Sequence, residues 1–225
     1  MFKYETHLHT REASACASAS GAEQAARYKE LGYDGIIVTD HFFNGNCTAE
    51  IRDATDPAEK IALFCKGYEN AKAEGDRIGL KVFFGWEYCY NGADLLTYGL
   101  DKDWLLRNPD VCAISVFDYC RRVHRDGGYI VHAHPFREAG YLNEIRLLPQ
   151  WTDAVEAYNC GNSSRDMDAR ASWYAQQYGK PVTAGTDNHH LTADPISGVF
   201  TEAPLMTVQD YINAVANREV GLVIP

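Results

Sequence analysis

Two histidines near the start of the chain, His7 and His9, have the spacing of a metal-binding pair. They follow residues 2–6, which we expect to form a short strand. Side chains two positions apart on a strand point to the same face, so both imidazoles would aim at one point. Two converging neutral imidazoles suit a divalent transition metal. Two unrelated surface histidines would give the same spacing, and the rest of the chain favours the metal.

Similar polar residues recur at or near the ends of predicted strands. Seven of the eight histidines lie in or beside such ends. They are His7, His9, His41, His132, His134, His189 and His190, and the carboxylates Glu87, Glu156 and Asp187 accompany them. The eighth, His124, falls inside a predicted helix, where we expect a solvated face. Isolated histidines are scattered over surface and core, so this distribution indicates one shared site.

Strand-like and helix-like segments alternate along the 225 residues. Strands are predicted at 2–6, 35–41, 81–90, 94–100, 129–135, 153–159 and 180–189, with a short strand near 199 and a final apolar piece at 221–224. Helices are predicted at 22–31, 57–78, 115–125, 142–148, 165–178 and 208–217. This alternation indicates an α/β protein with a parallel sheet. No linker divides the chain, so we expect a single domain over residues 1–225.

The placement of the polar residues favours a closed sheet over an open one. In a closed β/α barrel, the carboxyl ends of all strands meet at one mouth. In an open sheet, the functional groups gather only at the crevice where the strand order reverses. Because nearly every predicted strand ends in polar groups here, we expect the closed arrangement.

Composition restricts the partners. The formal net charge is −10 and the pI about 5.2, so long nucleic acid and anionic membranes are unfavourable partners. No apolar run approaches the roughly 20 residues that span a bilayer, and the start has no signal-peptide pattern. The seven cysteines are scattered and form no Cys-x-x-Cys pair. We therefore expect reduced thiols in a cytoplasmic protein, whose oligomeric state the sequence does not indicate.

Five short motifs, in order, resemble those of the PHP (polymerase and histidinol phosphatase) family of metal-dependent phosphoesterases. They are His7-x-His9, Asp40-His41, the strand end at Glu87, His134-Pro135, and Gly185-Thr186-Asp187-Asn188-His189. The resemblance covers nearly the whole chain. It implies a distorted (β/α)7 barrel that holds two or three divalent ions, often zinc, manganese or iron.

The resemblance also implies a set of metal ligands. His7, His9 and Asp187 would hold a first ion, and Glu87 would bridge it to a second ion that His134 also binds. His41 and His189 would hold a third.

Two positions depart from the family pattern. Many relatives have an acidic or histidine ligand soon after the first motif, where this chain offers Glu12 or Cys16, or only ordinary loop residues. Many also have a histidine after the bridging glutamate, where this chain has Asp94. Asp94 replaces that histidine, or the second ion is weakly held, so two ions are the safer expectation.

Four further polar residues have weaker claims. Asp40 precedes His41 on a strand and points to the other face, so it is expected to support the site rather than bind metal. His132 shares the face of His134 and is expected one layer below it, with a smaller chance of being a ligand. Glu156 lies mid-strand and reads as structural. His190 contacts substrate or is merely exposed to solvent.

The expected reaction is hydrolysis of a small phosphate ester, either like histidinol phosphate or a nucleotide. A hydroxide that bridges two metal ions would attack phosphorus. Asp187 would act as a metal ligand. His189 or a metal-bound water would be the general acid, and Arg137 would bind the phosphoryl group. The Arg137 guanidinium would neutralise the phosphoryl oxygens, unless it merely pairs with Glu138 or Glu144 at the surface.

Two other functions remain open. Amidohydrolase-type barrels also begin with His-x-His, but they usually need a carbamylated lysine or similar bridge, whose role Glu87 takes here. A metal-binding scaffold without catalysis is the other alternative. The observation that favours a scaffold is that this chain has Asp94 where many relatives have a histidine.

Overall fold

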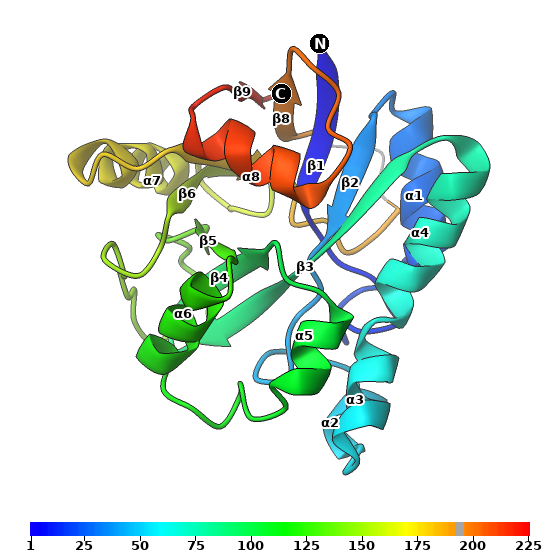
Figure 1. Ribbon diagram of the computed structural model, residues 1–225. Coiled ribbons are helices and arrows are strands. Elements are labelled where there is room, and N and C mark those ends of the chain that lie inside the picture. Colours follow the sequence, from blue (N-terminus) through cyan, green and yellow to red (C-terminus); the bar gives the residue numbers. More distant parts are fainter. Residues whose placement is uncertain (192–195) are drawn as a thin grey trace.

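A nine-stranded sheet organises residues 1–191 and 196–225, which the computed structural model describes (Figure 1). The strand order is β7-β6-β5-β4-β3-β2-β1-β8-β9. The strands are β1 (Phe2–Leu8), β2 (Gly35–Val38), β3 (Lys81–Tyr90), β4 (Ala93–Tyr98), β5 (Tyr129–Ala133), β6 (Ala154–Asn159), β7 (Val182–Gly185), β8 (Gly198–Thr201) and β9 (Gly221–Val223). The predicted α/β class is confirmed, although the number of strands and their directions differ from those expected.

The expectation of a parallel sheet is wrong for part of the molecule. β1, β2 and β3 are parallel, as are β5, β6 and β7, but β4 runs antiparallel to both of its neighbours. The cause is a two-residue hairpin turn at Asn91-Gly92, where φ is +29° and +82°. Asn-Gly is a strong hairpin signal because both residues tolerate positive φ. Strands β8 and β9 add two more antiparallel pairings.

The sheet curls until it is nearly closed between β1 and β7. Just beyond these strands, Leu8 and Asn188 form an isolated parallel bridge. The His9 amide donates to the Asn188 carbonyl at 3.0 Å, and the Asp187 amide donates to the His7 carbonyl at 2.9 Å. Closure therefore occurs where the first and last predicted motifs lie, and the expectation of a barrel-like sheet is confirmed.

Eight helices are described around the sheet. They are α1 (Gly21–Glu30), α2 (Ala49–Asp53), α3 (Pro57–Phe64), α4 (Lys66–Ile78), α5 (Lys102–Arg107), α6 (Val116–Arg125), α7 (Arg165–Gln177) and α8 (Val208–Ala216). Ser20 and Ser115 cap α1 and α6, each accepting a hydrogen bond from a first-turn amide. None of the described helices is long and apolar enough to cross a membrane.

Three details of the predicted helices are wrong. The segment expected as one helix at 57–78 is divided at Cys65 into α3 and α4. The short helix expected at 142–148 is absent, and the Arg146 amide donates instead to the Gly92 carbonyl of the hairpin at 3.1 Å. A segment this short forms few helical hydrogen bonds to offset the cost of nucleation. Helix α5 was missed, although Asp101 is a readable N-cap that accepts from the Trp104 amide.

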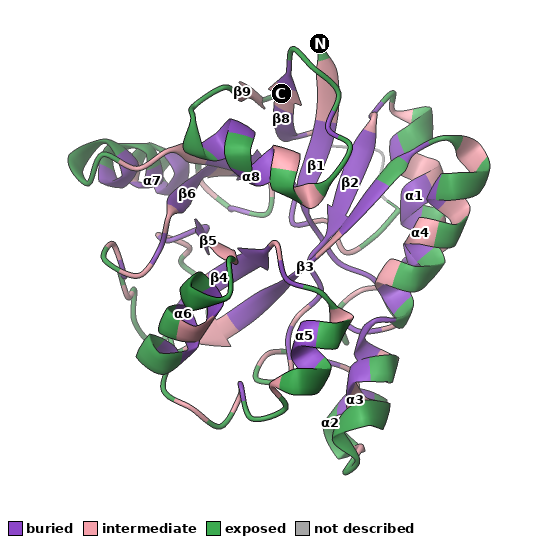
Figure 2. Ribbon diagram, viewed as in Figure 1, coloured by how far each residue is buried: buried purple, intermediate pink, exposed green. Residues whose placement is uncertain are grey.

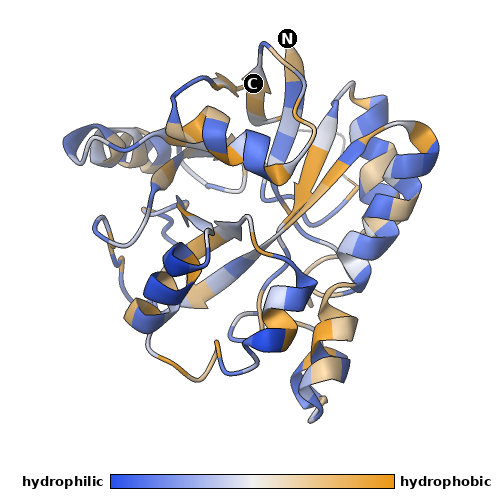
Figure 3. Cartoon of the chain, viewed as in Figure 1, coloured by the Kyte–Doolittle hydropathy of each residue, from blue (hydrophilic) through white to orange (hydrophobic). Residues whose placement is uncertain are grey.

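Most strand residues are buried, β9 being only half-buried, and the helices expose mainly their outer sides (Figure 2). Helices α1 and α4 cover β1, β2 and β3 through a shared apolar cluster, and β2 is almost entirely hydrophobic in colour (Figure 3). Helix α7 packs on β6. This enclosure fixes the strands rigidly, so the side chains at their carboxyl ends have defined positions.

Candidate metal centre

Seven of the predicted ligands converge at the carboxyl ends of the strands. They are His7 and His9 at the end of β1, His41 after β2, Glu87 in β3, His134 after β5, and Asp187 and His189 after β7. We call these residues the cluster. It borders a cavity of about 1140 Å³ that includes the side chains of His41, Glu87 and Asp187 in its lining. The structure thus brings together residues from both ends of the chain.

Glu87 lies at the centre of the cluster. Its Oε2 is 2.7 Å from Nδ1 of His41. Its Oε1 is 3.1 Å from Nε2 of His134 and 3.3 Å from Nε2 of His7. The two oxygens of one carboxylate therefore face different imidazoles, which is the position that a carboxylate bridging two ions needs.

His7, His9 and Asp187 form one compact set of possible ligands. Oδ1 of Asp187 is 3.1 Å from Nε2 of His9 and 3.4 Å from Nε2 of His7. Both nitrogens are buried and make no hydrogen bond among the described residues. A buried polar atom without a partner carries a free-energy penalty. A divalent ion would satisfy both nitrogens and the carboxylate, so this set fits a metal.

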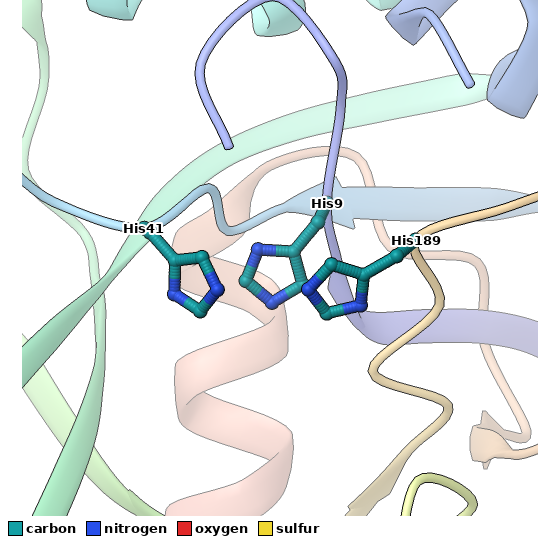
Figure 4. A group of neighbouring side chains, drawn as sticks. All are labelled: His9, His41 and His189. Carbon is teal, nitrogen blue, oxygen red and sulfur yellow. The ribbon is translucent and has the colours of Figure 1, made fainter. Parts of the chain in front are cut away.

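His9, His41 and His189 form a second set, which we call the nitrogen end (Figure 4). Their candidate ligand atoms lie within 4.8 Å of one another. The His9 ring centroid is 4.1 Å from that of His189 and 4.3 Å from that of His41. Nδ1 of His189 donates to the Asp187 carbonyl at 2.8 Å, so its Nε2 carries a lone pair.

Glu87, Asp94 and His134 form a third set, which we call the oxygen end. Asp94 lies on β4, opposite Cys89 of β3 and Ala133 of β5. This position puts the Asp94 carboxylate beside His134 and Glu87. Burial and the neighbouring Glu87 carboxylate raise the pKa of Asp94.

Glu156, on the side of the cluster away from the cavity, makes hydrogen bonds to His7 and to His134. Oε1 of Glu156 is 3.0 Å from Nδ1 of His7, which leaves Nε2 of His7 facing the cluster. The other oxygen of Glu156 accepts from the His134 amide at 3.0 Å. Carboxylates placed in this way fix the tautomer and orientation of metal-binding histidines. Glu156 also falls in one possible ligand set, with His7 and His134.

Asp40 supports His9 through Ser14. The Ser14 hydroxyl donates to Oδ1 of Asp40 at 2.7 Å. Because that proton is committed, the hydroxyl oxygen accepts from Nδ1 of His9 at 3.1 Å, and Nε2 of His9 is left deprotonated. Asp40 thus contacts the chain behind the cluster, in agreement with the supporting role expected for it.

The backbone is strained at two cluster residues. His134 has φ of +26° and Asp187 has φ of +57°, in the left-handed region that residues other than glycine seldom adopt. Beside them, Gly185 has no room for a side chain, since a Cβ would lie 2.5 Å from Cβ of His7 and 2.6 Å from Oε1 of Glu156. Such strain concentrates at functional sites, where surrounding structure holds it in place.

Electrostatics favour the metal-binding forms of Glu87, Asp187 and His9. Burial raises the pKa of Glu87, but the nearby imidazoles of His41 and His7 outweigh it and hold that pKa well below the ordinary value. Burial and the neighbouring imidazoles keep the pKa of His9 well below its ordinary value. Ionised carboxylates and neutral imidazoles are the forms that bind metals.

The pKa of His7, like those of His41 and His189, is raised above its ordinary value. Burial lowers its pKa, but three neighbouring carboxylates outweigh burial and raise that pKa well above the ordinary value. The carboxylates around His7 therefore favour a positive charge at this position, which a bound metal ion would supply in place of a proton.

Arg137 lines the cavity but is held by the cluster. Its Nη1 is 2.5 Å from Oδ2 of Asp187, and its side chain is mostly buried. The alternative of a surface pair with Glu138 or Glu144 is wrong, because each of those carboxylates pairs with another arginine. The phosphate-binding role of Arg137 stays a prediction.

Of the two loop candidates, the structure excludes Glu12. Its carboxylate accepts from the Gly21 amide at 3.1 Å and from Nδ2 of Asn70 at 2.8 Å, so it serves the start of α1 rather than the cluster. Cys16 lines the cavity. Sequence reasoning missed Cys89, whose Sγ lies 4.0 Å from Nδ1 of His41.

The remaining histidines lie outside the three ligand sets. His132 is buried, but its Nδ1 is 3.4 Å from the Tyr174 hydroxyl of α7, so the expected position beneath the metal centre is wrong. His190 borders the cavity, where its Nδ1 is 2.8 Å from the Ser18 hydroxyl. His124 lies at the surface of α6, as expected.

A second residue that sequence reasoning missed is Glu5. It is completely buried, and burial raises its pKa to about 7. Its Oε1 accepts from the amides of His7 at 2.8 Å and Thr186 at 3.0 Å. Glu5 therefore ties the end of β1 to the end of β7 beneath the cluster. An acidic residue in a buried strand, on the same face as His7, was the signal.

Comparison with known proteins supports the fold rather than an identity. No protein-family model matches the chain, and no curated protein matches it. Solved structures do match. A two-domain protein of Bacteroides vulgatus, containing a predicted PHP-like metal-dependent phosphoesterase, aligns over 99% of this chain with a TM-score of 0.75 and 12% identity. This chain spans 64% of that protein's length.

Two further structures align along most of both chains. A candidate metal-dependent phosphoesterase of Bifidobacterium adolescentis has a TM-score of 0.59 and 15% identity, covering 98% of this chain and 97% of that one. An amidohydrolase of Chromobacterium violaceum has a TM-score of 0.55 and 12% identity, covering 97% of each. The likeness to PHP-like metal-dependent phosphoesterases is therefore confirmed at the level of the fold.

Proposed function

We propose that this protein is a metal-dependent hydrolase of phosphate esters. The observation that carries the proposal is the position of Glu87, whose two oxygens face His7, His41 and His134. Beside it, the buried Nε2 atoms of His7 and His9 have no hydrogen-bond partner. This donor set suits two or three divalent ions of zinc, manganese or iron.

The proposed ligands follow the three sets. His7, His9 and Asp187 would hold one ion, and Glu87 would share it with a second ion held by Asp94 and His134. His41 and His189 would hold a third. Divalent ions bound there supply Lewis acidity toward a phosphoryl oxygen and lower the pKa of water.

The residues of the chain itself would orient the ester. Arg137 is fixed by Asp187 and has N–H groups at the cavity wall, where they can donate to a phosphoryl oxygen. When only two ions are bound and His189 holds none, its Nε2 can carry a proton toward the leaving alkoxide, because its Nδ1 is held by a backbone carbonyl. Asp187 would contribute as a ligand.

The remaining predictions belong to the same proposal. The substrate would be a small phosphorylated compound, of the histidinol phosphate or nucleotide type, and the cavity of about 1140 Å³ has room for more than a phosphoryl group. The chain would act as one domain over residues 1–225, a variant of the sevenfold PHP barrel, in the cytoplasm.

Amide or ring hydrolysis is the second candidate. The amidohydrolase of Chromobacterium violaceum shares this fold along nearly its whole length. The two candidates need the same ions and differ in the bond that is cleaved, so activity on matched substrates separates them.

The test combines metal content with turnover. Protein purified without chelator is assayed by elemental analysis and on p-nitrophenyl phosphate, bis(p-nitrophenyl) phosphate and p-nitroacetanilide. We expect two or three ions per chain and chelator-sensitive release of nitrophenol. His9→Ala should lose both, whereas the matched control His124→Ala, outside the cluster, should keep both.

Three outcomes would contradict the proposal. Full turnover in His9→Ala would place the reaction elsewhere, and release of nitroaniline alone would favour the amidohydrolase. Bound metal without turnover on a broad phosphoester panel would favour a metal-binding scaffold.

A further inference from the structure

Three side chains hold the Arg137 guanidinium at the same time. Its Nη1 donates to Oδ2 of Asp187 at 2.5 Å, its Nη2 to Oδ1 of Asn159 at 2.7 Å, and its Nε to Oδ1 of Asn162 at 3.2 Å. A guanidinium has five N–H groups, so at most two remain for another partner. Arg137 lines the cavity, although its side chain is only 13% exposed. The fold therefore sets the orientation of this guanidinium independently of a substrate.

The two asparagines each join the guanidinium to a carboxylate. Nδ2 of Asn159 donates to Oε2 of Glu156 at 2.8 Å, and Nδ2 of Asn162 donates to Oδ1 of Asp168 at 2.8 Å. In both side chains the oxygen faces Arg137 and the nitrogen faces a carboxylate, so an amide that turned over would lose both contacts. Both asparagines are buried. A buried polar network whose members are hydrogen-bonded is rigid.

The loop between β6 and α7 carries both asparagines and is itself fixed. Oδ1 of Asp168, in the first turn of α7, also accepts from the Asn159 amide at 3.1 Å. Gly161 lies between the two asparagines, where a Cβ would be only 2.9 Å from Nη2 of Arg137. The absence of a side chain at Gly161 therefore lets the loop backbone approach the guanidinium closely.

Neutral acceptors suit a guanidinium that binds an anion. Of the three acceptors around Arg137, only Asp187 carries a charge. An amide oxygen accepts a hydrogen bond without cancelling the positive charge, whereas a carboxylate in its place would neutralise it. In the proposed metal centre, the charge of Asp187 is shared with an ion. Arg137 thus keeps positive charge for a phosphoryl oxygen while its orientation stays fixed.

We propose that Asn159 and Asn162 are positioning residues, whose amides hold the Arg137 guanidinium in the orientation that binds a phosphoryl group. Asp168 supports both through the loop. The inference rests on the proposed phosphoesterase function and adds residues that act through Arg137 rather than on the ester. A donor held in place beforehand needs little reorganisation when the phosphoryl group binds. A purely structural network would stabilise the fold and leave phosphate affinity unchanged.

Phosphate affinity in a double-mutant cycle tests the inference. Asn162 is the residue to change, because Asn159 also contacts Glu156. Metal-loaded protein is titrated with inorganic phosphate by calorimetry, and KM and kcat are measured on p-nitrophenyl phosphate. We expect Asn162→Ala to weaken phosphate binding and raise KM by about 3-fold, with kcat and metal content unchanged. In the Arg137→Lys background, which lacks the Nε–H group, the same substitution should have no further effect.

Asn108→Ala is the matched control for the cycle. Oδ1 of Asn108 also accepts from an arginine, Arg122, at 3.4 Å, but Asn108 does not line the cavity. Phosphate affinity and KM should stay at the values of the unaltered protein.

Three results would overturn the inference. They are unchanged phosphate affinity in folded Asn162→Ala, an equally large effect in the Arg137→Lys background, and a loss of metal that accounts for the weaker binding. If Asn162→Ala does not fold, Asn162→Ser takes its place in the cycle, since serine is too short to keep both hydrogen bonds. Metal-loaded protein that neither binds phosphate nor hydrolyses any ester would instead defeat the proposed function itself.

Discussion

The two ends of the cluster differ in donor chemistry although they share a cavity. The oxygen end offers the carboxylates Glu87 and Asp94 with one imidazole, His134. The nitrogen end offers three imidazoles and has the Cys16 thiol beside it. Hard oxygen ligands suit manganese or magnesium, and imidazole with thiolate suits zinc. If the cluster binds metal as proposed, its two ends would therefore favour different ions.

The supports of the two ends differ as well. At the oxygen end, Glu156 holds the His134 amide, and β4 brings Asp94 in by a tight hairpin. At the nitrogen end, a loop anchored by Ser14 and Ser18 positions Cys16. Strands are more rigid than loops, so the nitrogen end should tolerate changes in sequence and ion more readily.

Glu87→Gln should abolish the difference between the ends, because Glu87 faces both. We expect loss of metal from the whole cluster and a fall in turnover of about 10³-fold or more. Elemental analysis and phosphoesterase assays measure both effects. Glu144→Gln is the matched control, since Glu144 lines the same cavity outside the cluster. A variant that kept its metal would show that Glu87 does not bridge the ends.

Asp94→Asn should affect one end alone. Removing the charge of Asp94 should weaken binding of an ion at the oxygen end by about 100-fold. Binding of an ion at the nitrogen end should remain unchanged. Equal loss at both ends, seen in a metal titration followed by absorbance and calorimetry, would mean that the ends are not separable.

Glu156→Gln should weaken metal binding more mildly, by about 10-fold, because the amide still contacts His7 but no longer balances its charge. The effect should appear in the ion shared by His7, His9 and Asp187. A calorimetric titration compared with Asp94→Asn would detect it. Unchanged affinity would mean that Glu156 has only a packing role.

Arg137→Lys should give the smallest change. Lysine keeps the positive charge beside Asp187 but loses the planar donor geometry. We expect about a 5-fold rise in KM for a phosphate ester, with metal content unaltered. If metal content falls and KM does not change, Arg137 serves Asp187 rather than the substrate.

The positions of the site residues were predictable because they depend on local patterns. His-x-His, Asp40-His41 and Asp187-x-His189 end buried strands, and strand ends of one sheet meet when the sheet closes. The closure itself followed from polar groups on nearly every strand. Both inferences need only two properties of the strands. Their side chains alternate between the two faces, and their sequences are apolar.

What escaped prediction depended on contacts between distant residues. The position of Glu12 in the sequence is compatible with a ligand of the cluster. In the structure, however, its carboxylate accepts hydrogen bonds from the Gly21 amide and from Asn70 instead. Cys89 approaches the cluster only because β3 places it beside His41, whereas the role of Glu5 had a signal in the sequence that was overlooked. The direction of β4 is a different case, since the Asn91-Gly92 signal was in the sequence and was overlooked.

The hydrogen bond between Glu5 and Thr186 spans 181 positions of the sequence. It joins the first strand to β7 near the end of the chain, so it forms only after nearly all of the intervening residues have found their places. Contacts of such separation form late, because a long loop must close first. During synthesis, His7 and His9 therefore emerge long before Asp187. If the cluster binds metal as proposed, its full set of ligands exists only once this contact has formed, so metal capture would be a late step of folding.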